Sequence, residues 1–433
     1  MNSQKSIRWP LILMTGMLVI LITGLGFVFN RKPNNSEEKG SSVKIIKSDN
    51  HYQLLYNGEP YFVKGAGGNS HLDLLKKAGG NSIRTWGADH AGKILDEANS
   101  HGLTVTLGLW LRHESDFDYN NTSAVKKQQE KILSYVKKYK NAPALLVWGL
   151  GNEIELGSNP ANASMWKAVN RLAGDIKKID PNHPVMTVVA EINRKKLDAI
   201  KKYYPNIDIL GVNSYGPALT VAGRLHDLGW AKPYMLTEFG PVGWWESPKT
   251  SWGAPIEANS TVKEGRYLSD YETAVASHKG WILGSYVFLW GHKWEQTSTW
   301  FSMFLPKSEA ALGTVDAMSI AWKGNKPENS APGIISFHSD AGLMKISAGS
   351  IHHARVQSRD IDQDTLHYQW EIRSEKPVKG NKDTIVYPQD IISQKGDALT
   401  FKSPGQAGAY RLFVYVFDGK GKAATANVPF YVK

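Results

Sequence analysis

The chain has 433 residues, 42% of them hydrophobic, a length that suits one large domain followed by a smaller one. It contains no cysteine, which excludes disulfides, thiolate nucleophiles and cysteine-ligated metals. The formal net charge of +11 comes from lysines scattered over predicted helix faces without a nucleic-acid motif, so we expect no nucleic-acid partner.

Residues 1–30 contain an uncharged, almost wholly apolar run from Trp9 to Phe29. Its length is close to the ~20 residues that a helix needs to cross a bilayer. Lys5 and Arg8 precede the run, which favours a cytoplasmic N-terminus. A cleaved signal peptide is the alternative, but the small-residue cleavage site is absent. We therefore expect a transmembrane anchor, with the rest of the chain periplasmic or at the cell surface; cleavage would make the protein secreted.

Residues 31–43 are polar and turn-rich, which predicts a flexible linker. After a hairpin-like lead-in, apolar β-branched runs alternate with amphipathic helical stretches. The eight candidate strands are 61–64, 81–86, 103–111, 144–150, 184–190, 207–213, 234–237 and 282–290. Eight strand–helix units predict an α/β fold with a (β/α)8 barrel over residues 44–324. A doubly wound sheet is the alternative, but it usually has fewer strands and a complete glycine fingerprint after the first strand.

Two glutamates close the fourth and seventh predicted strands. Glu153 ends the run Trp-Gly-Leu-Gly-Asn-Glu, and Glu238 ends an apolar run that begins at Tyr234. The two positions are 85 apart, close to the ~90 residues that three strand–helix units of roughly 30 residues occupy. Both side chains should therefore project at the C-terminal mouth of the barrel, where barrel enzymes carry their active sites.

Turn-forming residues 325–333 break this pattern and predict a linker. Beyond them the apolar period changes to two, so residues 334–433 are predicted to form an immunoglobulin-like β-sandwich. The stretch from Asp360 to Trp370 resembles polycystic-kidney-disease (PKD) and cadherin-like repeats. Asp360, Asp362 and Asp364 could bind calcium there, but a bare Asp-rich turn is the favoured interpretation.

With these motifs, residues 44 to about 323 resemble retaining glycoside hydrolases of the large (β/α)8 clan that contains families 2, 5 and 72. The resemblance implies that Glu153, which follows an asparagine, is the general acid/base and that Glu238 is the nucleophile. The acid must hold a proton near neutral pH and the nucleophile must stay ionised. A separation of roughly 5–5.5 Å between the carboxyl groups would permit direct attack and retention of configuration. Two ion-paired glutamates at strand ends are the purely structural alternative.

The same resemblance assigns supporting roles. Arg84 should lie near Glu238 and keep it ionised, unless it forms a plain surface salt bridge. Asn152 should bond the sugar 2-hydroxyl, and Tyr215 should donate a hydrogen bond to Glu238. Trp290, at the end of the eighth strand, should be the platform under the sugar that is cleaved.

Further substrate-binding residues are expected at the other strand ends. Asn213 stands where family 5 has the histidine of its His-x-Tyr motif, and this Asn-x-Tyr form is closer to family 2 or family 72. Trp86 ends the second strand. His113 should bind a sugar hydroxyl. The acidic residues near it resemble a metal-binding cluster, but their spacing matches no zinc pattern, so we expect neither a metal nor a cofactor. The loop 241–262 should carry Trp244 and Trp245 in a wall of the substrate site, with ordinary packing as the alternative.

These observations predict a membrane-tethered retaining β-glycosidase that hydrolyses a poly- or oligosaccharide, with a β-glucan as the expected substrate. A β-glucanosyl transglycosidase using the same two glutamates is the first alternative, because the sequence does not show acceptor affinity. A non-catalytic carbohydrate-binding protein on the same fold is the second.

Overall fold

The computed structural model describes residues 40–49, 51–376 and 384–433. Within these ranges no helix is long and apolar enough to cross a membrane. The predicted anchor over residues 1–30 lies outside the described residues, as does most of the predicted linker.

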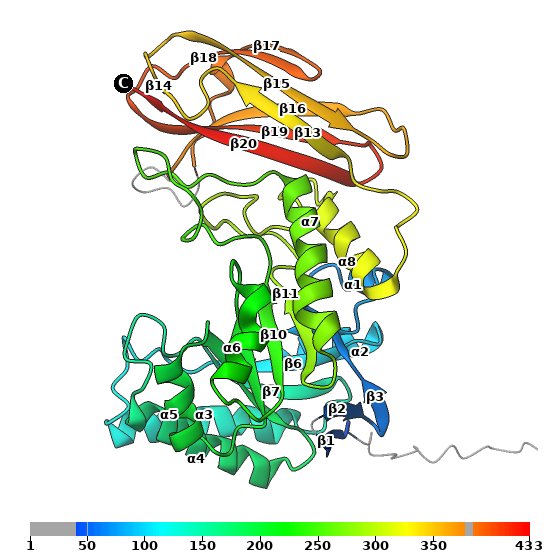
Figure 1. The fold of residues 1–433 in the computed structure, drawn as a ribbon, viewed down its shortest axis with the longest axis vertical. Coiled ribbons are helices and arrows are strands. Elements are labelled where there is room, and N and C mark those ends of the chain that lie inside the picture. The colour runs from blue at the N-terminus through cyan, green and yellow to red at the C-terminus, as the bar shows by residue number, and fades with distance from the viewer. Residues whose placement is uncertain (1–39, 50, 377–383) are drawn as a thin grey trace, which may run out of the picture. The chain divides into compact units, whose positions relative to one another are not determined.

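The eight predicted strands form a closed parallel barrel (Figure 1), so the (β/α)8 prediction is confirmed and a doubly wound open sheet is excluded. Every strand pairs with its neighbours in the chain, and the last strand closes on the first. The strands are β4 (Val63–Gly67), β5 (Ser82–Arg84), β6 (Thr104–Leu109), β7 (Leu145–Asn152), β8 (Val185–Ala190), β9 (Ile209–Asn213), β10 (Tyr234–Phe239) and β11 (Ile282–Val287).

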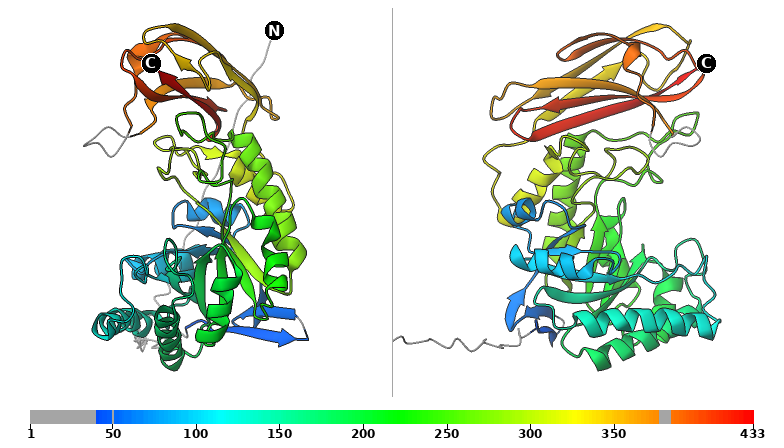
Figure 2. Two further views of the ribbon diagram at one scale, coloured as in Figure 1. Left: turned by 60° about the vertical axis from the view of Figure 1, so that its left-hand side comes forward. Right: turned by 180° about the vertical axis from the view of Figure 1, so that it is seen from behind.

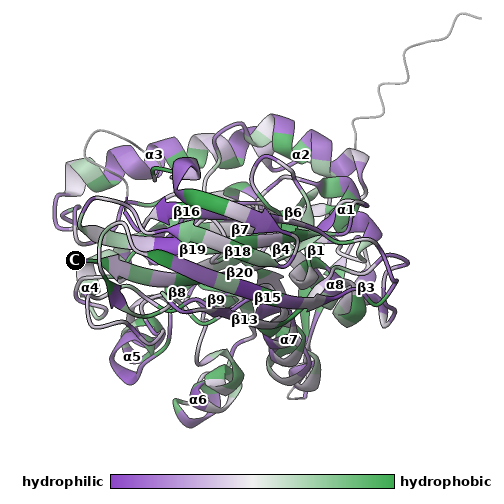
Figure 3. Cartoon of the chain, turned by 90° about the horizontal axis from the view of Figure 1, so that it is seen from above, coloured by the Kyte–Doolittle hydropathy of each residue, from purple (hydrophilic) through white to green (hydrophobic). Residues whose placement is uncertain are grey.

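Amphipathic helices cover the barrel and alternate hydrophilic and hydrophobic stretches along their length (Figure 3). They are α1 (Leu72–Lys77), α2 (Ala91–Ser100), α3 (Thr122–Tyr139), α4 (Ala163–Ile179), α5 (Arg194–Tyr203), α6 (Val221–Asp227), α7 (Ser260–Asp270) and α8 (Gly313–Lys323). Short helical turns are η1 (Ala218–Thr220), η2 (Tyr271–Val275) and η3 (Ala276–His278). Asparagine side chains accept backbone N–H groups at the start of α3, α4, α5 and α7, which satisfies donors that a helix end leaves unpaired.

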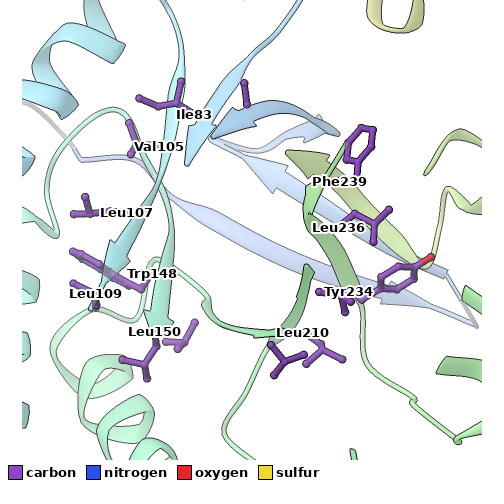
Figure 4. Packing of buried hydrophobic residues seen from close by; sticks show 14 of the residues in the cluster. Ile83, Val105, Leu107, Leu109, Trp148, Leu150, Leu210, Tyr234, Leu236 and Phe239 are labelled. Carbon is purple, nitrogen blue, oxygen red and sulfur yellow. The ribbon is translucent and has the colours of Figure 1, made fainter. Parts of the chain in front are cut away.

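Apolar side chains fill the layer between strands and helices. Trp148, Leu210 and Leu236 belong to this cluster (Figure 4), and all three are fully buried. A second cluster, which includes Met186 and Met235, also contains side chains of a small antiparallel sheet. The strands of this sheet are β1 (Val43–Ser48), β2 (His51–Tyr56) and β3 (Glu59–Tyr61). Successive residues such as Met235 and Leu236 thus enter different clusters, as expected where side chains alternate along a strand.

The chain is already packed where the flexible linker was predicted to end. The Ser41 hydroxyl donates to the Leu145 carbonyl oxygen at 2.7 Å, and Val43 N–H donates to the Asn182 carbonyl oxygen at 2.8 Å. Since these hydrogen bonds tie residues 41–43 to the start of β7 and β8, the expected flexibility up to residue 43 is wrong for this last part.

Two further sheets share one core beyond the barrel (Figure 2). One has the order β12-β20-β19-β16 with β14 on β20, and the other has the order β13-β15-β18-β17. The strands are β12 (Ala311–Leu312), β13 (Gly333–Ser339), β14 (Lys345–Ile346), β15 (Ile351–Arg359), β16 (His367–Ser374), β17 (Ile391–Lys395), β18 (Ala398–Lys402), β19 (Gly408–Phe417) and β20 (Lys422–Val432), with the helical turn η4 (Pro388–Asp390) before β17.

The strand β12, which belongs to the barrel part of the chain, pairs with the edge of one sandwich sheet. β12 precedes α8, and Ala311 pairs with Lys422 of β20. The helix α8 begins directly after this short strand, at Gly313. Arg411 of β19, fully buried, donates to the carbonyl oxygen of Pro255 at 2.7 Å in the loop after β10. Sandwich and barrel loops consequently share backbone and side-chain hydrogen bonds.

Candidate active site

The two glutamates stand at the carboxyl ends of barrel strands four and seven, as the residue spacing predicted. Glu153 follows β7, and Glu238 is the penultimate residue of β10. Each comes directly after a register shift, between Gly149 and Asn152 on β7 and between Leu236 and Glu238 on β10. Such irregularities redirect side chains at barrel rims. Glu153 also has a positive φ of 50°, an uncommon conformation for a residue with a side chain.

Glu238 is 6% exposed and receives three hydrogen bonds. Arg84 Nη1 donates to Oε1 at 2.9 Å, and Trp86 Nε1 donates to the same oxygen at 2.7 Å. The Tyr215 hydroxyl donates to Oε2 at 2.8 Å. The Arg84 hydrogen bond is charge-assisted, because it joins a guanidinium to a carboxylate. The structure therefore places the expected partners on the nucleophile candidate and gives Trp86 a contact to Glu238 as well.

Glu153 has a different environment. Burial raises its pKa from the ordinary value of 4.5 to about 7, and the negative charge of Glu238 adds to the effect. The hydrogen bond from Asn213 Nδ2 to Glu153 Oε1, 2.8 Å long, acts in the opposite direction because it favours the ionised form. The carboxyl group can thus hold a proton near neutral pH.

Asn152 and Asn213 join the two carboxyl groups into one network. Asn152 Oδ1 accepts from Arg84 Nη2 at 2.6 Å and from Asn213 Nδ2 at 3.3 Å. The Thr237 hydroxyl donates to Asn213 Oδ1 at 2.7 Å, which fixes the amide with its N–H groups toward Glu153. The side-chain N–H groups of Asn152 have no hydrogen-bond acceptor within residues 40–49, 51–376 and 384–433, so they remain available to a ligand.

Glu155 and Lys196, which the sequence reasoning missed, form a buried ion pair beside the acid candidate. Lys196 Nζ lies 2.6 Å from Glu155 Oε1, and both side chains are almost fully buried. Ala190 N–H donates to the same oxygen at 3.0 Å, while Lys196 Nζ donates to the Glu191 carbonyl oxygen at 2.9 Å. The pair ties the turn after β7 to the loop after β8. The sequence feature that could have indicated this pair is a second glutamate two positions after the acid candidate.

The prediction that Trp290 is the platform under the sugar is wrong. Trp290 is 1% exposed, and its Nε1 donates to the His71 carbonyl oxygen at 3.2 Å. β11 ends at Val287, so Trp290 lies three residues beyond the strand and packs against Phe304 and Trp322.

Phe288, which the sequence reasoning missed, is the aromatic residue that lies at the site. It follows β11 directly and meets the rings of Trp86 and Tyr215 edge-on, with centroids 5.8 and 6.0 Å away. Trp245 is 47% exposed and meets the Tyr215 ring edge-on at 5.4 Å, which leaves ring surface open beside the site. Trp244 is half-buried and contacts the Trp245 ring edge-on at 5.6 Å.

His113 is not brought to the two glutamates by any described contact; its ring centroid lies 5.4 Å from that of Trp110. The acids around it face separate partners, Arg112 for Asp116 and Asn162 for Glu114. The other acidic stretch is an Asp-rich turn, in which Asp360 Oδ1 accepts from the N–H groups at positions 362 and 364.

Comparisons with known proteins agree with this geometry. Residues 70–247 match the family model of glycosyl hydrolases family 2, TIM barrel domain. The β-glucuronidase of Sus scrofa is 26% identical over 276 residues, which are 54% of this chain and 39% of that protein. The β-galactosidase of Vibrio cholerae is 22% identical over 175 residues, which are 36% of this chain and 16% of that protein. The chain thus spans well under half the length of these relatives.

Solved structures show the same fold. A GH2 β-galacturonidase from Eisenbergiella tayi matches with a TM-score of 0.51 and 17% identity, covering 67% of this chain and 55% of that chain. A β-glucuronidase from an uncultured Clostridium sp. matches with a TM-score of 0.51 and 15% identity, covering 66% and 54%. By the family model and the curated relatives, the barrel is thus similar in sequence to glycoside hydrolase domains.

Proposed function

We propose that this protein is a retaining β-glycosidase that cleaves the O-glycosidic bonds of an oligo- or polysaccharide by double displacement. The contrast between two carboxyl groups in one network carries the proposal. Glu238 receives three donors, one of them cationic, whereas Glu153 receives one amide and has a pKa of about 7. One carboxylate that stays ionised and one carboxyl group that holds a proton are the two groups that this reaction needs.

The residues of the network suit both steps of the reaction. In the first, a Glu238 oxygen bonds to the anomeric carbon and the glycosidic bond breaks, while Glu153 gives its proton to the departing oxygen. In the second, ionised Glu153 takes a proton from water, the water oxygen bonds to the anomeric carbon, and the ester bond to Glu238 breaks. The open N–H groups of Asn152 can donate to a sugar hydroxyl, a contact that strengthens in the transition state.

The sugar is narrowed to three classes of β-linked substrate. The similar β-glucuronidases and β-galactosidases suggest β-glucuronides and β-galactosides, whereas the sequence predicted a β-glucan. We propose these three β-linked classes as the candidate substrates. Transfer to a sugar instead of water would use the same two glutamates. An extracytoplasmic location with a membrane anchor over residues 1–30, and an immunoglobulin- or PKD-like character of the sandwich, stay proposals from the sequence.

The test uses aryl β-glycosides of glucose, galactose and glucuronic acid, with leaving groups of low and high pKa. Glu238→Ala should lower kcat by several orders of magnitude on every substrate, because no nucleophile remains. Glu153→Gln should retain a burst of glycosylation with the most acidic leaving group, which needs no protonation, and then turn over slowly. Proton NMR of the first-formed product should show the anomeric configuration of the substrate.

Glu130→Gln on the exposed side of α3 serves as the matched control and should keep the wild-type rate. Inversion of configuration would contradict the double-displacement mechanism. Turnover at the wild-type rate in either active-site variant would contradict the catalytic role that is assigned to the substituted glutamate. Lengthened oligosaccharide products would instead favour the transglycosidase.

A further inference from the structure

A pocket with a cavity volume of about 460 Å³ lies beside the barrel mouth, outside the network described above. Its walls come from the loops after β5 and β6 and from α3. The apolar wall includes Trp110, Phe117, Ile132 and Tyr135. A concave, mostly apolar wall with a few polar groups is the usual composition of a small-molecule site, and the volume falls in the range of such sites.

The pocket begins one residue from the nucleophile's hydrogen-bond partner. Trp86 donates to Glu238, and the next residue, Gly87, lines the pocket. A Cβ atom on Gly87 would lie 3.9 Å from Cβ of Trp110, the residue that follows β6. The loop after β5 thus contributes one residue to the site of Glu238 and the next to the pocket.

Trp110 supplies an accessible aromatic surface. It is 47% exposed, and the tilted ring of His113 lies against it. Phe117, by comparison, is covered by the Arg112 guanidinium, 5.2 Å from the ring centroid. A half-exposed indole in a pocket wall can stack against the C–H face of a pyranose ring, a large apolar contact for a polar ligand.

The polar rim of the pocket is positive. Lys127 and Lys131 stand one turn apart on α3, and neither has an ion-pair partner within the described ranges. Their neighbour Lys126, which does not line the pocket, pairs with Glu130 at 3.9 Å. Asp89 is the acid of the lining, so the lysines leave the rim with a net positive charge. Such a rim attracts and orients an anionic group.

We propose that this pocket is a further sugar-binding subsite for a glycosyl unit that carries a carboxylate. The ring stacks on Trp110, and the carboxylate pairs with Lys127 and Lys131. The proposal deepens the proposed function, because it makes the substrate a glycan with uronic acid units near the cleaved bond.

Isothermal titration calorimetry of the full chain with Glu238→Ala, which prevents turnover, tests the subsite. The probes are a glucuronate-containing tetrasaccharide and the same tetrasaccharide with its carboxyl groups reduced to alcohols. Joint Lys127→Ala and Lys131→Ala substitution should weaken binding of the acidic probe about fivefold, as exposed charge pairs do, and leave the neutral probe unchanged. Trp110→Ala should weaken both probes by roughly tenfold, because both rings lose the aromatic contact.

Lys137→Ala on the same helix, outside the pocket, is the matched control and should bind both probes as the parent does. Equal affinity of parent and double variant for the acidic probe, or equal weakening for both probes, would overturn the proposal. The turnover of small aryl β-glycosides by the wild type is measured separately. If that turnover is absent while the lysine-dependent binding is present, the hydrolase proposal fails and the subsite stands.

Discussion

Glu153 should reduce the stability of the fold at alkaline pH, and Glu153→Gln should remove that cost. Its folded pKa of about 7 lies above the ordinary value of 4.5. The folded protein therefore binds more protons than the unfolded chain between these values, so stability falls as pH rises from 4.5 to 7. Glutamine has the same shape, can accept the hydrogen bond from Asn213 and carries no charge.

The size of the effect follows from the two pKa values. Their difference corresponds to about 3 kcal/mol, since each pH unit is worth about 1.36 kcal/mol. This is a ceiling because Glu153 is partly exposed to solvent. With an unfolding entropy of about 2.1 cal/mol/K per residue over roughly 400 residues, the ceiling corresponds to a rise in Tm of about 4 °C.

Thermal unfolding of wild type and Glu153→Gln at pH 4 and at pH 8.5 provides the measurement. The two proteins should have equal Tm at pH 4, where both side chains are neutral, and the variant should be more stable at pH 8.5. Glu130→Gln controls for the loss of one exposed carboxylate. Parallel loss of stability in wild type and Glu153→Gln between the two pH values would refute the pKa and the environment that causes it.

Three further outcomes follow from the site and its supports. On the alkaline side of the pH profile, kcat/KM should fall with a midpoint at about pH 7. Asn213→Ala should move this midpoint to higher pH, because Asn213 stabilises ionised Glu153; an unchanged midpoint would show that another group is the acid. Tyr215→Phe should lower kcat by about 10- to 100-fold in steady-state assays, since it removes one hydrogen bond to the charged nucleophile; an unchanged kcat would deny that role. Arg411→Ala should lower the free energy of unfolding by about 3–5 kcal/mol in denaturant titrations, because a buried carboxylate loses its cation. A loss below about 1 kcal/mol there would indicate a surface-like pair.

Much of the fold could be predicted because hydrophobic periodicity is a local property of the chain. All eight predicted strand runs overlap a barrel strand, and the positions of Glu153 and Glu238 followed from counting strand units. Helix starts were equally local, since asparagine caps precede four of the helices. A local pattern does not show where distant segments pair: residues 311–312 form a sandwich strand because β20 offers them a partner.

The sequence by itself determined the barrel, its two carboxyl groups and the residue types around them. Only the tertiary structure decided that Phe288 lies at the site while Trp290 packs outside it, because β11 ends at Val287 and the regular alternation of side chains along a strand does not extend to the residues after it. It also decided that Glu153 holds a proton near neutral pH. That property depends on burial and on the charge of Glu238, which lies far away along the chain and is brought close only when the barrel closes.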